Sequence, residues 1–194
     1  MKASSLNKYA LGMLLLIPAM ARADVFISDE INTKPTANSF SICYQHSCKS
    51  IAQLQLTHQQ WQSIRILFAE DIDSAAQERA VIKLAIAKLE LLIGEMTATD
   101  NDKGANARGF TVPGNQMDCI DESTNTSTYI AMLQHDKLLK WHQLKDRVTR
   151  GFFLFGWPHT TAVIEEQQTG ENWAVDSWFH DNGVSPEIIP LSQW

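Results

Sequence analysis

The sequence predicts an α+β domain, with helices packed on a small antiparallel sheet. Apolar residues recur at helical spacing over 57–71 and 74–94, in the first half of the chain. In the second half, the runs 160–164 and 172–178 favour strands, and Gly170 lies between them, which is typical of a β-hairpin. Helices that precede strands in this way are the pattern of an α+β domain.

Capping residues indicate where the expected helices begin and end. Thr57 is a suitable N-cap for the first helix. Ser74 can cap the second, because Gln77 follows three residues later as in a capping box, and Gly94 is expected to end that helix. A third helix is expected to begin near Cys119.

Two further strands and a long loop complete the expected domain. The segments 40–44 and 144–155 favour strands, whereas 97–116 is rich in Thr, Asp, Asn and Gly and is expected to be a surface loop. The acidic residues of this loop resemble a calcium site only loosely, because Gly104 is out of register and no glutamate closes the loop. The sequence therefore implies no metal and no cofactor.

The N-terminus has the features of a secretory signal peptide. Lys2 and Lys8 flank the start, an apolar run covers 10–17, and Ala21-Arg22-Ala23 forms a small-x-small cleavage site. The apolar run is shorter than the roughly 20 residues of a membrane-spanning helix, although an uncleaved anchor is the alternative. We expect residues 1–23 to be removed, which leaves residues 24–194 as one exported domain, periplasmic or extracellular, without a transmembrane segment.

The expected mature chain is acidic. Without Lys2, Lys8 and Arg22 it has 13 basic and 22 acidic residues, and its net charge is −9. Phosphate contacts from basic side chains supply most of the affinity for nucleic acids. An acidic chain without a basic stripe therefore argues against a nucleic-acid partner.

The three cysteines divide into a close pair and a single residue. Cys43 and Cys48 can close a short loop, and close cysteines tend to pair in the oxidising compartments that exported proteins enter. We expect a disulfide between them, with free or metal-bound thiols as the alternative. Cys119 is then left over, either as a cross-link to another chain or as a reactive thiol.

Cys119, His159 and Asp176, together called the triad below, have complementary chemistry. A thiol at a helix N-terminus lies at the positive end of the helix dipole, which is expected to lower its pKa. His159 stands at the start of one expected strand and Asp176 late in the next, so the carboxylate can orient the ring and the ring can take the thiol proton. A register slip of one residue would turn one of the two side chains to the wrong face.

The sequence around the triad resembles the transglutaminase-like and papain-like cysteine enzymes, including bacterial transglutaminase-like cysteine proteinases. The resemblance covers about 115–178 and lies in three motifs, which are DCIDES at 118–123, PHTTAV at 158–163 and WAVDSW at 173–178. It implies a papain-like or transglutaminase-like core and thiol acyl chemistry. Cys119 would attack an amide or ester carbonyl, His159 would transfer the proton, and Asp176 would orient His159.

The resemblance also implies an oxyanion hole and a substrate class. The hole would use the Cys119 backbone N–H and a second donor, for which Gln116 and Asn115 are candidates by proximity. Peptides or proteins, with cell-wall peptides among them, are the expected substrates. Acidic residues flank Cys119 on both sides, and carboxylates raise the pKa of a nearby thiol unless they point away.

Two other functions are compatible with the same residues. An envelope protein that binds or scaffolds could retain this fold without turnover. The triad could instead hold a metal ion, although the chain lacks paired ligand motifs such as C-x-x-C. Three histidines without such context are expected at the surface: His135, His142 and His180.

Overall fold

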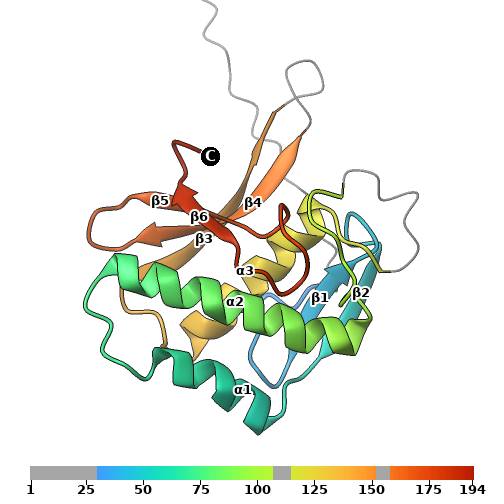
Figure 1. Cartoon of the computed structure of the whole chain (residues 1–194), viewed down its shortest axis with the longest axis horizontal. Coiled ribbons are helices and arrows are strands. Elements are labelled where there is room, and N and C mark those ends of the chain that lie inside the picture. The colour runs from blue at the N-terminus through green and yellow to red at the C-terminus, as the bar shows by residue number, and fades with distance from the viewer. Residues whose placement is uncertain (1–29, 107–114, 152–157) are drawn as a thin grey trace, which may run out of the picture.

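The computed structural model describes residues 30–106, 115–151 and 158–194. The expected signal peptide lies outside these residues, as do residues 152–155 of the strand expected over 144–155. In the described part of the chain, the structure contains helices and two small antiparallel sheets (Figure 1), so the expected mixture of helices and antiparallel strands is confirmed. None of the described helices is long and apolar enough to cross a membrane.

The two-stranded sheet pairs β1 (Phe40–Tyr44) with β2 (Ser50–Leu54), and Tyr44 lies opposite Ser50. β1 agrees with the strand expected over 40–44. β2 was not predicted, because its SIAQL sequence is only half-buried and gives a weak alternating pattern.

The first helices begin where their capping residues predict. Thr57 caps α1 (His58–Arg65) with a complete capping box. The helix is shorter than expected, because the chain tightens into the 3-10 turn η1 (Ile66–Phe68) instead of continuing as an α-helix to residue 71. The Ser74 side chain accepts a hydrogen bond from the Gln77 backbone N–H at the start of α2 (Ala75–Thr97).

Gly94 does not end α2, which was a wrong prediction. The helix continues to Thr97, and Ala98 ends it in the left-handed conformation at φ 54°. Gly94 instead permits a close approach between segments. A Cβ at this position would lie 2.9 Å from Asn182 Nδ2 and 3.1 Å from Asp100 Cα, so the absence of a side chain is a packing requirement.

The four-stranded sheet has the order β3, β4, β5, β6, and all its pairs are antiparallel. Its strands are β3 (His142–Arg150), β4 (His159–Glu166), β5 (Asn172–Asp176) and β6 (Glu187–Pro190). The expected hairpin is present as β4 and β5. The four-residue β6 was not predicted, because it is short and ends in a proline.

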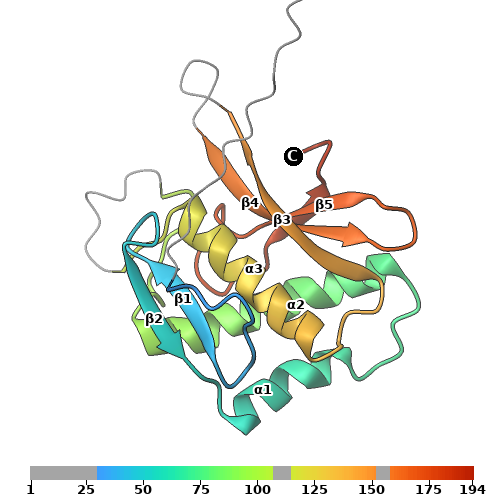
Figure 2. The ribbon, with the colours of Figure 1, turned by 180° about the vertical axis from the view of Figure 1, so that it is seen from behind.

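The helix α3 (Cys119–His135) lies between α2 and the sheets (Figure 2). Its apolar side chains form the core together with those of α2 and of one face of the four-stranded sheet. Fully buried members of this core include Ile82, Ile86, Leu89, Ile130, Leu133 and Ile164. The helix that carries Cys119 at its first position is therefore the central element of the domain.

A buried contact between Glu78 and His142 fixes the connection from α3 to β3. Glu78 is fully buried and accepts hydrogen bonds from the backbone N–H groups of Lys140, Trp141 and His142, and its carboxylate lies 2.8 Å from His142 Nδ1. Burial alone would raise the pKa of Glu78, but these hydrogen bonds outweigh it and the pKa is lowered. His142 is 1% exposed, so the prediction of a surface position was wrong. Its partner Glu78 is distant in sequence and could not be recognised from the sequence alone.

Candidate active site

The first turn of α3 holds Cys119 at the N-terminus of a buried helix. Asp118 is the N-cap, and its Oδ1 accepts the backbone N–H groups of Ile120 and Asp121, each at 3.0 Å. The Asp121 carboxylate in turn accepts a hydrogen bond from the Asp118 backbone N–H, which completes a capping box. The acidic residues around the cysteine are therefore the capping groups that start its helix.

The strands β4 and β5 bring His159 and Asp176 together. Ala162 lies opposite Val175 in the register, which places Thr161 opposite Asp176 and puts His159 on the same face, two residues away. His159 Nε2 lies 2.6 Å from Asp176 Oδ2, and both side chains are buried. This hydrogen bond leaves Nδ1 as the ring nitrogen available for another partner.

Cys119 lies beside the start of β4. The Thr160 backbone forms a hydrogen bond to the Cys119 side chain, and the charge of Asp176 acts on the thiol. His159 Nδ1 is buried and has no hydrogen-bond partner among the described residues. The structure therefore brings the three residues of the triad into one region. The residue that carries the unpartnered Nδ1, His159, directly precedes Thr160, whose backbone contacts the sulfur.

The pKa of the Cys119 thiol is raised, contrary to the expectation from its helical position. Burial is the main cause, and the carboxylates of Asp118 and Asp176 add to it. Hydrogen bonds from the Thr160 and Cys119 backbones oppose the rise without reversing it. The resting site therefore favours a protonated thiol.

Three aromatic rings enclose the imidazole. The ring centres of Trp178, Phe179 and Trp194 lie 4.8, 5.1 and 5.4 Å from that of His159. Trp194 Nε1 also donates a hydrogen bond of 2.6 Å to Asp176 Oδ2, the oxygen that His159 contacts. Trp194 was not predicted as a site residue, because it lies outside the three motifs around the triad.

The two oxyanion candidates are engaged elsewhere. Gln116 donates from its side chain to the Asn101 backbone carbonyl and accepts from Asn106 Nδ2 at 2.7 Å, so it holds the preceding loop together. Asn115 Nδ2 donates to the Thr97 carbonyl at 2.8 Å. Both side-chain amides thus have other partners, and the Cys119 backbone N–H, which bonds the thiol, is the donor that remains near the sulfur.

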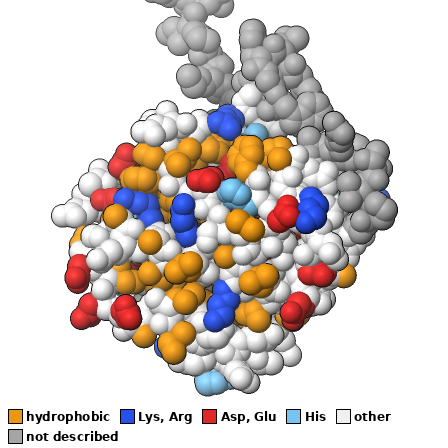
Figure 3. Space-filling model, viewed as in Figure 1, with side chains coloured by type: hydrophobic (Ala, Val, Ile, Leu, Met, Phe, Trp, Pro, Cys, Tyr) orange, Lys and Arg blue, Asp and Glu red, His pale blue; other side chains and the backbone are white. Residues whose placement is uncertain are grey.

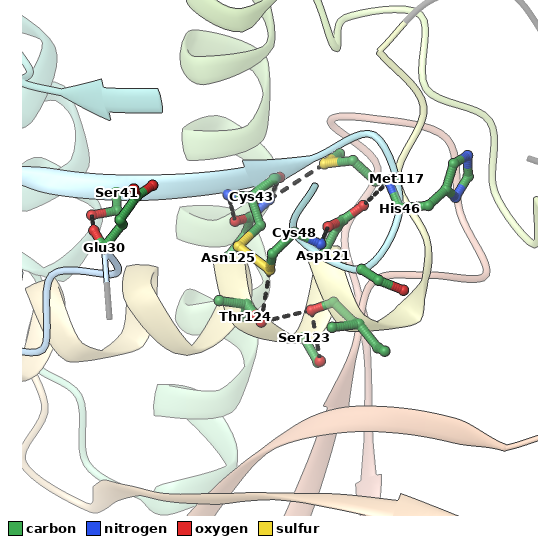
Figure 4. Close-up of a disulfide and its surroundings, with 12 residues drawn as sticks. Glu30, Ser41, Cys43, His46, Cys48, Met117, Asp121, Ser123, Thr124 and Asn125 are labelled. Atoms are coloured by element: carbon green, nitrogen blue, oxygen red, sulfur yellow. Dashed lines mark hydrogen bonds between the residues drawn. A yellow bond between two sulfur atoms is a disulfide. The ribbon is translucent and has the colours of Figure 1, made fainter. Parts of the chain in front are cut away.

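A left-handed loop binds the capping groups of α3. Four consecutive residues without glycine, Gln45 to Cys48, have φ between 54° and 66°, a conformation that costs roughly 1–2 kcal/mol per residue. The backbone N–H groups of His46 and Cys48 donate to Asp121 at 2.7 and 2.6 Å (Figure 4). The backbone N–H of Ser47 donates to Asp118 at 2.9 Å. The capping carboxylates therefore hold the loop and the helix at once.

A disulfide between Cys43 and Cys48 closes this loop. Cys43 belongs to β1, where its backbone N–H and carbonyl bond the side chain of Asn125 on α3, each at 2.8 Å. The crosslink thus ties the strained loop to a strand that is itself anchored on α3 (Figure 4). Among the described residues, Cys119 is the cysteine outside a disulfide.

Three buried carboxyl groups lie behind the site. Glu90, Asp102 and Glu122 are 3–4% exposed, and a hydrogen bond joins Asp102 to Glu122. Burial raises the pKa of Glu90 to about 8 and that of Asp102 to about 6, and it raises the pKa of Glu122 well above its usual range. The Ser177 hydroxyl, next to Asp176 in the chain, bonds Glu90. Glu90 and Glu122 therefore hold protons at neutral pH, whereas Asp102, with a pKa of about 6, is mostly ionised there.

Potential metal ligands gather elsewhere in the described chain. One group consists of the disulfide pair Cys43 and Cys48 with Asp121, and the other of His46, Asp118 and Asp121. The sulfurs of the first group are bonded to each other, and the carboxylates of both groups already accept backbone N–H groups. The triad atoms do not form such a group in the described part of the structure.

Comparison of the chain with protein-family models, with curated proteins and with solved structures gives no match. A function for this chain is therefore inferred below from the geometry of the site.

Opening the disulfide should loosen the loop and the start of α3. We expect the double substitution Cys43→Ser/Cys48→Ser to lower the free energy of unfolding by about 2–4 kcal/mol. Backbone amides 46–48, 120 and 121 should exchange hydrogen faster than in the native protein, because their carboxylate acceptors lose a fixed partner. Hydrogen exchange monitored by NMR measures both sets, with the amides around Ile86 as the internal reference. Unchanged protection at 46–48 and 120–121 would show that the disulfide does not maintain this contact.

The buried carboxyl groups should make the protein less stable as the pH rises. A folded pKa of about 8 for Glu90 lies above its usual value of 4.5. Stability is therefore fully present below about pH 4.5 and is lost as the pH rises through about 8, on the order of 1 kcal/mol per pH unit for one proton. Glu90→Gln should remove this slope, so the variant gains stability relative to the native protein between pH 5 and 8. Urea unfolding at several pH values measures the free energy of unfolding. Glu95→Gln, at an exposed position of the same helix, is the control. An equal slope of stability against pH in native protein and Glu90→Gln would contradict the raised pKa of Glu90.

Proposed function

We propose that this protein is an exported, thiol-dependent amide hydrolase or acyl transferase that acts on peptides, with cell-wall peptides among the candidate substrates. The observation that carries the proposal is the His159–Asp176 hydrogen bond, which leaves a buried and unpartnered Nδ1 near a thiol at a helix N-terminus. A nucleophile, a base and a group that orients the base are the parts that covalent acyl transfer needs.

The proposed reaction begins with a protonated thiol. His159 Nδ1 accepts the proton as the Cys119 sulfur attacks the carbonyl carbon, and Asp176 stabilises the imidazolium that forms. The Cys119 backbone N–H, which no capping carboxylate accepts, donates to the oxyanion of the tetrahedral intermediate. The imidazolium then returns its proton to the leaving amine, which gives a thioester on Cys119. Water or an amine, deprotonated by His159, attacks the thioester and releases the product and the thiol.

The raised pKa of Cys119 favours general-base catalysis over a preformed thiolate. A thiolate at rest would need a neighbouring cation, whereas the charged groups acting on this sulfur are the carboxylates of Asp118 and Asp176. A protonated thiol also resists oxidation better than a thiolate. This property suits an exported protein, and the disulfide between Cys43 and Cys48 is compatible with an oxidising compartment.

The same raised pKa favours one alternative, in which the protein binds or scaffolds in the envelope without turnover. The two functions differ in what they require of Cys119. Under the enzymatic proposal, a Cys119→Ala variant that folds normally loses the cellular phenotype of the gene, whereas full function of that variant would support the binding protein.

Cys119 should depend on His159 for its reactivity. We expect iodoacetamide at neutral pH to label Cys119 in His159→Gln about 100-fold more slowly than in the native protein, because the base that accepts its proton is lost. Mass spectrometry of the labelled protein over time measures the rates. His135→Gln, an exposed position at the other end of α3, is the matched control and should label at the native rate. Equal rates in native protein and His159→Gln would defeat the proposed acid–base pair.

A further inference from the structure

Arg150, the last residue of β3, lies beside the proposed base. It is directly opposite His159 in the antiparallel pairing, and directly opposed residues have Cβ atoms about 4.5–5.5 Å apart on the same face. Its guanidinium carbon lies 4.3 Å from the ring centre of Trp194. Strand register and stacking on the indole thus place a cation next to the imidazole.

This guanidinium has no anionic partner in the described part of the chain. Other arginines do: Arg65 pairs with Asp136 and Arg79 with Glu166. Arg147 also lacks a carboxylate among the described residues, but it donates to the hydroxyls of Ser123 and Thr124 on α3. Arg150 is exposed, and stacking on an indole leaves the N–H donors at the edge of its plane free for a bidentate anion.

The surroundings of Arg150 strengthen its attraction for an anion. The rings of Trp178, Phe179 and Trp194 exclude water from one side of His159, and Phe179 is 42% exposed, so apolar surface adjoins the charge. Figure 3 shows the face of the molecule seen in Figure 1, where apolar side chains gather at the top beside a basic and a histidine side chain. A charge at the edge of apolar surface is less screened than one in bulk water.

We propose that Arg150 binds a carboxylate of the substrate, so that the substrates are amides with a carboxylate close to the scissile bond. The proposal rests on the proposed thiol chemistry at Cys119. A planar carboxylate matches the two parallel N–H donors of a guanidinium. Binding it beside His159 positions the neighbouring carbonyl at the sulfur, and Arg150 thereby acts as the residue that determines specificity.

Two alkylating reagents that differ in charge test the site without a known substrate. Iodoacetate carries the carboxylate, and iodoacetamide is its neutral counterpart of nearly equal size. The quantity measured is the ratio of their rates of reaction with Cys119, by mass spectrometry, which cancels changes in thiol reactivity common to both reagents. We expect this ratio to fall about fivefold in Arg150→Gln, because a charge attraction at a partly screened site is lost.

Three comparisons make the test specific. Arg150→Lys retains the charge and should retain most of the native ratio. Arg65→Gln removes the same charge at a distant ion pair and should leave the ratio unchanged. Raising the salt concentration to about 1 M should bring the native ratio towards that of Arg150→Gln, because the Debye length falls to about 3 Å.

The outcomes separate this proposal from the one on which it rests. A ratio that is the same in native protein and Arg150→Gln, with Cys119 reactive in both, would overturn the carboxylate site and leave the thiol chemistry standing. A native Cys119 that is inert to both reagents would overturn both proposals. Arg150→Gln is expected to fold, because the side chain is exposed and makes no ion pair with the described residues, and circular dichroism checks this.

Discussion

The contact between the left-handed loop and the first turn of α3 is the constraint on which the site depends. Asp118 accepts the first N–H groups of the helix and Asp121 accepts the N–H of Asp118, and both carboxylates also accept N–H groups of the loop at 46–48. The left-handed backbone conformation of the loop is unfavourable in free energy, and charge-assisted hydrogen bonds and the Cys43–Cys48 disulfide offset it. Cys119 lies between these two aspartates, so its place in the molecule is set from both sides of the helix cap.

The same arrangement explains why the thiol is not activated at rest. A helix N-terminus usually favours a thiolate, but here burial raises the pKa of the thiol, the N–H groups of Ile120 and Asp121 are already bonded to Asp118, and the charge of Asp118 opposes that of a thiolate. The His159 imidazole must then accept the thiol proton during the reaction, and two contacts orient this imidazole. Asp176 contacts Nε2, and Trp194 fixes the same carboxylate oxygen. These contacts support the proposal that His159 is already oriented as a base before substrate binds.

Local signals in the sequence predicted more of this structure than signals between distant segments. The caps at Thr57 and Ser74, the start of α3 and the hairpin of β4 and β5 follow from neighbouring residues, and the structure contains each. The burial of His142 and the contact of Trp194 with Asp176 could not be predicted, because each depends on a partner brought close only by the fold. The left-handed loop was also missed, since no glycine marks it. The cysteine shows the same limit: its helical position was predicted correctly, but the burial that raises its pKa, together with the charges of Asp118 and Asp176, depends on the folded structure.

The most direct test of the proposed site is the position of the proton on the neutral His159 ring. Nitrogen-15 NMR of the imidazole distinguishes a protonated from an unprotonated ring nitrogen. The hydrogen bond to Asp176 requires the proton on Nε2 and leaves Nδ1 free to accept the thiol proton. We therefore expect a protonated Nε2 and an unprotonated Nδ1 in the neutral ring, with this preference lost in Asp176→Asn. A neutral ring protonated on Nδ1 would contradict it, because His159 could not then act as the base for Cys119.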